Sequence, residues 1–156
     1  MKKLIKNYLK KGFLINLLFI GLFAIISVIY FYPLLSGKQI KQSDIDQFSG
    51  MSKQIVDHRS QYNEEPFWLD NAFLGMPSYQ VLVEYPFDLL DKLDRVIRFL
   101  PRPADYLFVY LVSFFLLLIT MKVKSEYAFI GAIAFAFSTY LIIILGVGHN
   151  TKALAI

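Results

Sequence analysis

Three long apolar runs dominate the pattern of hydrophobic and polar positions in this chain. They cover 13–35, 104–121 and 127–147, and each is close to the roughly 20 residues needed to cross a hydrocarbon core of about 30 Å. The segment between the first two runs, 36–103, is polar and holds ten of the twelve acidic residues. This pattern predicts an all-α integral membrane protein with three transmembrane helices and one large loop outside the membrane.

The long loop carries two helical patterns of its own. Ser43, followed three residues later by Asp46, resembles a capping box, and the apolar positions after it predict a helix over about 44–60. Apolar residues at helical spacing predict a second, amphipathic helix over about 87–100. Because this second helix leads directly into an apolar run, we expect it to lie on the outer surface of the membrane.

Composition and charge indicate the orientation of the spans. Hydrophobic residues make up 56% of the chain and its mean hydropathy is +0.51, which is more apolar surface than a soluble domain can bury. Five lysines lie in the N-terminal segment 1–12 and two in the turn 122–126, whereas the loop 36–103 is more acidic than basic. By the positive-inside rule, the first two segments lie in the cytoplasm, and the loop and the tail 148–156 lie outside. The net charge of +4 comes largely from these two lysine-rich segments, whose positions are explained by membrane orientation. No nucleic-acid partner is therefore expected.

The first run is expected to remain as an anchor in the cytoplasmic membrane. It is longer than the 7–15 apolar residues of a signal peptide, and no small-x-small cleavage site follows it. The chain ends just after the third run while it is turning apolar again. We therefore expect the N-terminal part of a longer, multi-pass protein.

Small and polar residues inside the runs predict how the helices pack. Ala128, Ala132 and Ala136 recur at intervals of four, which places them on one helix face and allows close helix contact. Asn16 is polar within an apolar run, and its simplest role is an interhelical hydrogen bond.

Two carboxylates, Asp44 and Asp46, follow the first run and are the candidate catalytic residues. On a helix, residues two apart point about 200° away from each other, so only one of them can face a given site. A carboxylate just above the bilayer could act as a general base toward an acceptor hydroxyl, or help to hold a divalent cation against phosphate oxygens. The alternative is that Asp46 caps the helix while Asp44 is solvated.

Candidate substrate-binding residues lie on the same side of the membrane. His149, Asn150 and Lys152 follow the third run and could bind a phosphate, or could simply form a polar cap at the interface. Arg102 could attract a lipid phosphate, although arginines commonly extend toward headgroups. Trp68 could stack on a sugar, or could belong to the core of a folded loop. The chain has no cysteine, so a thiolate nucleophile and a disulfide are excluded, and it has no nucleotide-binding or zinc-protease motif.

Five short motifs follow one another along the chain. In order they are Gln42-Ser43-Asp44-Ile45-x-Gln47-Phe48, Glu65-Pro66-x-Trp68, Gly75-Met76-Pro77-x-Tyr79-Gln80, Leu100-Pro101-Arg102-Pro103-Ala104-Asp105-Tyr106 and Gly148-His149-Asn150-Thr151-Lys152-Ala153. Together they resemble the YfhO-like bacterial membrane proteins. The resemblance covers almost the whole chain from the first run onward, and the family is much longer than this chain.

The resemblance implies an integral-membrane glycosyltransferase of the GT-C type. Such enzymes take a sugar from a polyprenyl-phosphate donor and pass it to an envelope polymer, lipid or protein. Asp44 matches the essential acidic position in the first outer loop, whereas Asp46 falls on a variable position. His149 and Asn150 match the motif after the third span, where a second group lies near the donor phosphate or a metal.

We therefore expect a membrane glycosyltransferase that acts outside the cytoplasmic membrane, with Asp44 as the base. The amphipathic helix at 87–100 would shape the entrance for the lipid donor. Two alternatives remain open: a non-catalytic protein that binds or transports envelope polymers, and an assembly subunit that docks a partner through Trp68 or Phe73. Consumption of lipid-linked sugar by the full-length protein distinguishes the first alternative from an enzyme.

Overall fold

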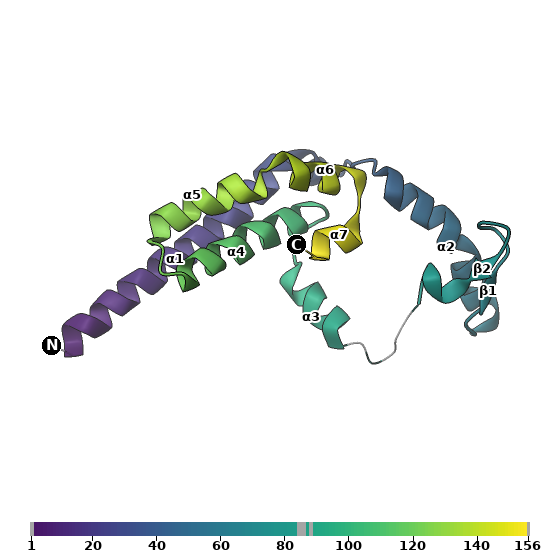
Figure 1. Ribbon diagram of the computed structural model, residues 1–156, viewed down its shortest axis with the longest axis horizontal. Coiled ribbons are helices and arrows are strands. Elements are labelled where there is room, and N and C mark those ends of the chain that lie inside the picture. The colour runs from purple at the N-terminus through teal and green to yellow at the C-terminus, as the bar shows by residue number, and fades with distance from the viewer. Residues whose placement is uncertain (1, 84–86, 88, 156) are drawn as a thin grey trace.

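The structure, a computed structural model, describes residues 2–83, 87 and 89–155 of the chain. It is mainly helical, with a bundle of three helices at the N-terminal side of Figure 1 and a separate helix–hairpin unit at the other end. In chain order the elements are α1 (Lys2–Tyr30), η1 (Tyr32–Ser36), α2 (Ser43–Tyr62), β1 (Trp68–Leu69), β2 (Met76–Pro77), η2 (Ser78–Gln80), α3 (Leu89–Ile97), α4 (Ala104–Thr120), α5 (Ser125–Ala136), α6 (Thr139–Val147) and α7 (Asn150–Ala155).

One helix in the described part of the chain is both long and apolar enough to cross a membrane. It is the segment Gly12–Tyr30 of α1. Together, α5 and α6 meet the same criterion, but their axes are bent by 52°, so they form either a broken span or a re-entrant pair. The helix α4 is apolar but has 17 residues.

The third apolar run is therefore not the single continuous helix expected over 127–147. The helix α5 ends at Ala136, and Ser138 adopts an extended conformation (φ −61°, ψ 143°) as the N-cap residue of α6. Serine and threonine favour helix N-termini over helix interiors, and Ser138-Thr139 supplies both side by side. Because the residues on both sides are apolar, a hydrophobicity pattern alone does not show the break. The ring of Tyr30 packs edge-on against Phe137 at the break, with ring centroids 5.1 Å apart.

Aromatic rings hold the three bundle helices together. Phe19 and Phe23 of α1 both contact Phe115 of α4 edge-on and stack on Phe129 of α5, with ring centroids between 4.7 and 6.0 Å apart. Phe23 and Phe115 are fully buried. This cluster fixes the N-terminal helix against the hairpin formed by α4 and α5.

The small-residue stripe of α5 packs as the sequence predicts. Ala128, Ala132 and Ala136 are fully buried in the core that α4 and α5 share. At Gly131 a Cβ atom would lie 2.8 Å from a methyl group of Leu118 in α4, so the two backbones approach closely there. The interhelical hydrogen bond expected of Asn16 is also present: the Ser125 hydroxyl donates to its Oδ1 at 2.6 Å.

The two loop helices differ from their expected bounds. The helix expected over 44–60 is α2, and Gln42 is its N-cap residue with no side-chain hydrogen bond at the cap. The helix thus begins one residue before the capping box suggested by Ser43 and Asp46, and the charge of Asp46 in the first turn complements the helix dipole. The helix expected over 87–100 is α3, which is shorter at both ends; position 88 lies outside the described residues.

A small hairpin covers the far end of α2. In it β1 and β2 pair antiparallel, with Trp68 opposite Pro77. The side-chain oxygen of Gln54 in α2 accepts hydrogen bonds from the backbone nitrogens of Asp70 (3.0 Å) and Asn71 (3.2 Å), which fixes the hairpin to the helix.

Candidate functional site

The structure brings Asp44 and His149 into direct contact. Asp44 lies in the first turn of α2, and His149 lies between α6 and α7. Nδ1 of His149 contacts Oδ2 of Asp44, as an ion pair when the imidazole is protonated and as a hydrogen bond when Nδ1 alone carries a proton. The Asp44 side chain is 29% exposed and that of His149 is 44% exposed, so both are open to solvent. A candidate catalytic carboxylate and a candidate substrate-binding residue thus occupy one place.

Two contacts beside this pair hold α2 against the end of α6. The side-chain nitrogen of Gln42 donates to the backbone oxygen of Leu145 at 2.6 Å, which satisfies one of the carbonyls left unpaired at a helix end. Gly148 ends α6 in a left-handed conformation (φ +92°) and lies directly against Gln42 and Ile45. A residue without a side chain is needed here, because the chain must both turn and approach α2 closely.

We expect Gly148→Ala to destabilise the protein by about 1–3 kcal/mol and to separate Asp44 from His149. The new Cβ atom would lie 2.9 Å from the Cβ of Gln42 and 3.0 Å from Cγ1 of Ile45, in a backbone conformation that alanine rarely adopts. Thermal unfolding of the purified protein in detergent measures the effect. Gly146→Ala is the matched control, because nothing lies within 4 Å of its Cβ position, and equal losses in both variants would contradict this role of Gly148.

A cavity of about 290 Å³ lies beside the chain neighbours of the pair. Its wall contains Ile45, which follows Asp44, and Asn150, which follows His149, together with Gln42, but neither Asp44 nor His149 itself. The other lining residues come from the loop after α1 and from the start of α4; they are Leu34, Gln39, Ile40, Arg102, Pro103 and Tyr106. One cationic group, amides and several apolar side chains therefore surround one space, which suits a phosphate carried on a hydrocarbon chain.

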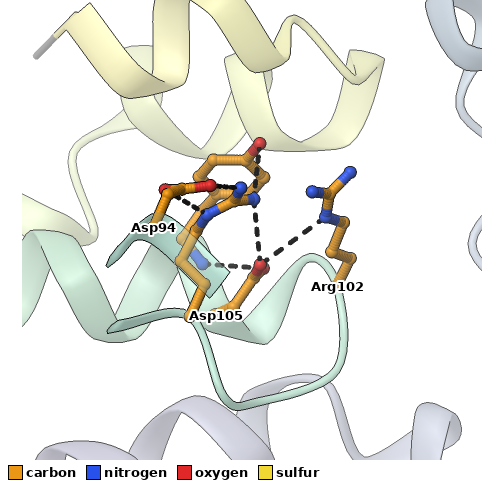
Figure 2. A network of polar contacts seen from close by, with 5 residues as sticks. Asp94, Arg102 and Asp105 are labelled. Atoms are coloured by element: carbon orange, nitrogen blue, oxygen red, sulfur yellow. Dashed lines mark hydrogen bonds and ion pairs between the residues drawn. The ribbon is translucent and has the colours of Figure 1, made fainter. Parts of the chain in front are cut away.

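Arg102 is oriented by a carboxylate behind it. Its Nε lies 3.7 Å from Oδ2 of Asp105, and Figure 2 shows the two outer guanidinium nitrogens pointing away from that carboxylate. The Arg102 side chain is 58% exposed, whereas that of Asp105 is 2% exposed. Arg102 can therefore offer its outer nitrogens to a ligand while Asp105 remains buried.

Asp105 belongs to a polar network that the sequence reasoning missed. Arg98 lies between Asp94 and Asp105 and also donates to the Tyr106 hydroxyl at 3.1 Å (Figure 2). The sequence analysis gives Asp105 no role of its own. The sequence does carry a signal for this network. A lone carboxylate stands at the start of the apolar run 104–121, and arginines lie three and seven residues before it. A turn between two helices can bring charges at this spacing together.

The remaining candidate residues, Asp46, Lys152 and Trp68, belong neither to the pair nor to the cavity wall. Asp46 is exposed. Lys152 is exposed on α7, and no partner for its side chain is found among the residues that the structure describes. Trp68 belongs to the hairpin at the far end of α2 (Figure 1), where its indole packs against the backbone of Gly75.

The sequence analysis names one candidate cofactor, a divalent cation held by a carboxylate. Within 2–83, 87 and 89–155, no group of three or more His, Asp or Glu side chains could hold a metal ion. Asp44 and His149 would give two ligands, which is fewer than a stable oxygen-rich site requires. These residues alone therefore do not form a cation site.

Comparisons with known proteins return no match. No family model matches the chain, and neither a curated protein nor a solved structure shows significant similarity to it. The features that bear on function are therefore the Asp44–His149 pair, the adjoining cavity and the arginine that the buried carboxylate orients.

Proposed function

We propose that this chain is the N-terminal part of a GT-C-like, YfhO-like membrane glycosyltransferase of the bacterial envelope. It transfers a sugar from a polyprenyl-phosphate carrier to an envelope polymer, lipid or protein outside the cytoplasmic membrane. The observation that carries the proposal is the contact between Asp44 and His149 beside a cavity that contains Arg102.

The proposed arrangement has three membrane-crossing segments: α1, α4 and the bent pair α5–α6. Lysines near the N-terminus and in the turn after α4 support a cytoplasmic position for those ends under the positive-inside rule. The candidate pair then lies at the opposite ends of these segments, on the outer side. An acceptor in the envelope and a donor lipid in the outer leaflet can both reach that level.

Asp44 serves as the general base in this proposal. His149 contacts Oδ2, and among the described residues Oδ1 has only a long hydrogen bond from the Ser43 hydroxyl (3.5 Å). Oδ1 therefore remains able to accept the proton of an acceptor hydroxyl while that oxygen attacks the anomeric carbon of the donor sugar. Fixing the carboxylate through His149 keeps it oriented before the reaction, and positioned general bases typically contribute about 10²–10⁴-fold to a rate.

Arg102 and Asn150 stabilise the leaving group. As the new bond to the anomeric carbon forms, the bond from that carbon to the phosphate oxygen breaks, and its electron pair remains on the phosphate. The outer guanidinium nitrogens of Arg102 and the amide of Asn150, both in the cavity wall, can donate to this developing charge. Leu34 and Ile40 give the same cavity an apolar side for the first units of the lipid chain.

The test of the proposed function is whether a lipid-linked sugar is consumed. Cells in which the complete parent gene has been deleted should accumulate one polyprenyl-phosphate sugar and lose the matching sugar from an envelope component, and restoring the gene should reverse both changes. Mass spectrometry of lipid extracts and of isolated envelope glycans measures the two quantities. An altered envelope with unchanged lipid-linked sugars would instead identify a protein that binds or moves envelope polymers.

A further inference from the structure

A second cavity lies along α2, apart from the Asp44–His149 pair. It is an open groove of about 400 Å³, which we call the α2 groove, and it is lined by one face of α2 and by Asn71 of the hairpin at the far end of that helix (Figure 1). None of its lining residues belongs to the cavity at Arg102, and the reaction proposed above does not use them. The lining residues from α2 recur at helical spacing; they are Gly50, Lys53, Gln54, Asp57, His58, Gln61 and Tyr62.

The polar side chains of the α2 groove combine donors and acceptors with little net charge. Gln54, Gln61 and Asn71 supply amides, each of which contains a donor and an acceptor, and Lys53 and Asp57 add one charge of each sign. Sugar hydroxyl groups also donate and accept, so this wall matches a saccharide. A ligand rich in phosphate would need several cations, and among the lining residues only Lys53 carries a fixed positive charge.

Contacts with the hairpin hold two of these amides in place. The side-chain oxygen of Gln54 accepts the backbone N–H groups of Asp70 and Asn71. The side-chain nitrogen of Asn71 makes long hydrogen bonds to the backbone oxygens of Gly50 (3.4 Å) and Met51 (3.5 Å). Among the described residues, the amide nitrogen of Gln54 and the side-chain oxygen of Asn71 have no further hydrogen bond. Both groups therefore remain available to a ligand, and their fixed positions reduce the entropy lost on binding.

Two rings give the far end of the groove an apolar surface. His58 and Tyr62 lie one turn apart on α2, with ring centroids 4.8 Å apart, and the Tyr62 side chain is 57% exposed. The face of an aromatic ring carries partial negative charge and attracts the C–H groups on the apolar side of a sugar. A saccharide therefore finds both of the contacts it needs in this groove, hydrogen bonds and a ring surface.

Gly50 keeps the near end of the groove open. It is an interior residue of α2, where glycine makes a helix less stable than alanine does. Nothing lies within 4 Å of its Cβ position, so no packing contact requires glycine there. A longer side chain at this position would instead extend over the groove. The missing side chain thus provides space at a cost to the helix, which an ordinary solvated helix face would not require.

We propose that the α2 groove binds a glycan chain and that this chain is the acceptor of the transfer reaction. The inference rests on the proposed function, and it narrows the acceptor to the saccharide part of an envelope polymer. Gly50 lies six residues after Asp44 and Tyr62 lies eighteen residues after it, which is about 9 Å and about 27 Å along the helix axis. An acceptor that fills the groove and reaches Asp44 must therefore contain several sugar units.

Binding is tested first, with the complete parent protein in detergent and without a donor. The probes are neutral oligosaccharides released from the envelope of the same cells and separated by length, and binding is followed by saturation-transfer NMR. We expect the long fractions to bind, and Gly50→Gln to weaken their binding by about tenfold or more, because its side chain fills the groove. Ser49→Gln is the matched control: it adds the same side chain at the neighbouring exposed position, outside the wall, and should bind as wild type does.

The stability of Gly50→Gln shows whether a loss of binding comes from the groove. Glutamine favours a helix more than glycine does, so this variant should unfold at a temperature no lower than wild type. If no oligosaccharide bound, or if Gly50→Gln bound the long fractions as wild type does, the proposal would be overturned. Equally tight binding of dextran sulfate, a polyanion, would show that charge alone attracts the ligand, and would also overturn it.

The transfer reaction then separates this inference from the proposed function. With a long acceptor, Gly50→Gln should raise KM by about tenfold and leave kcat within about twofold, since the groove binds the acceptor and does not touch the reacting atoms. An unchanged KM would overturn the acceptor groove and leave the glycosyltransferase intact. Glycan binding by a parent protein that consumes no lipid-linked sugar would overturn the proposed function and the acceptor role, while the loss of binding in Gly50→Gln would still identify the groove as the glycan site.

Discussion

Asp44→Asn is expected to lower sugar transfer by about 10²–10⁴-fold while the protein stays in the membrane in normal amount. Asparagine keeps the shape of the side chain and can still accept the hydrogen bond from Nδ1 of His149, so the contact between α2 and the end of α6 remains. What it loses is the ability to take a proton from the acceptor. The measurement compares the envelope glycans, the polyprenyl-phosphate sugars and the membrane abundance of the two proteins in cells that lack their own copy of the gene.

Asp46→Asn is the matched control for this result. Asp46 has the same chemistry and lies on the same helical turn, but it is exposed and makes no side-chain contact at the cap. We expect the transfer rate of this variant to stay within about twofold of wild type, because an exposed surface charge contributes little. Equal activity of Asp44→Asn and wild type would remove the proposed base, and equal loss in both variants would point to general damage of α2.

The second large effect is expected at Arg98. Arg98→Met should lower the free energy of unfolding by about 3–5 kcal/mol, because it leaves the buried Asp105 without its principal cation. Asp105 would keep its hydrogen bond from the backbone of Tyr106 and its 3.7 Å contact with Arg102, whose side chain is far more exposed than that of Arg98. Unfolding of the purified protein in mixed detergent, followed by circular dichroism, measures the change.

Two further variants show whether the buried charge is the cause. Arg98→Met combined with Asp105→Leu should recover most of the stability, because no unpaired charge is then buried. Arg102→Gln should cost less than about 1 kcal/mol, because that side chain is largely exposed and lies 3.7 Å from the carboxylate. If Arg102→Gln destabilised the protein as much as Arg98→Met, the distinction between the two arginines would be wrong.

Local sequence patterns predicted the helices of this protein better than they predicted its breaks. Apolar periodicity in the long loop located α2 and α3, and the alanine stripe indicated which face of α5 is buried. The break at Ser138 was not predicted, because Thr139–Val147 is as apolar as the helix before it. A hydrophobicity pattern does not show that the helix axis bends.

The sequence also predicts only part of the candidate site. The spacing of the apolar runs and the positions of the lysines predicted that Asp44 and His149 lie near each other, on one side of a membrane, and the structure places the two side chains in contact. That they touch depends on tertiary contacts, namely the left-handed turn at Gly148 and the hydrogen bond from Gln42, and no local rule predicts these. The role of Asp105 was missed for the same reason, since a carboxylate at the edge of an apolar run looks solvated until the folded chain buries it.

The contact between the start of α2 and the end of α6 also has a consequence for how the protein is made. Gln42 and Leu145 are 103 residues apart, and α1, α4 and α5 lie between them or directly before them. A nascent chain presents Asp44 long before His149 has been synthesised, and contacts so distant in sequence form late. The last helices to be synthesised therefore complete the site, and a chain whose synthesis stops before Gly148 carries the carboxylate without the partner that orients it.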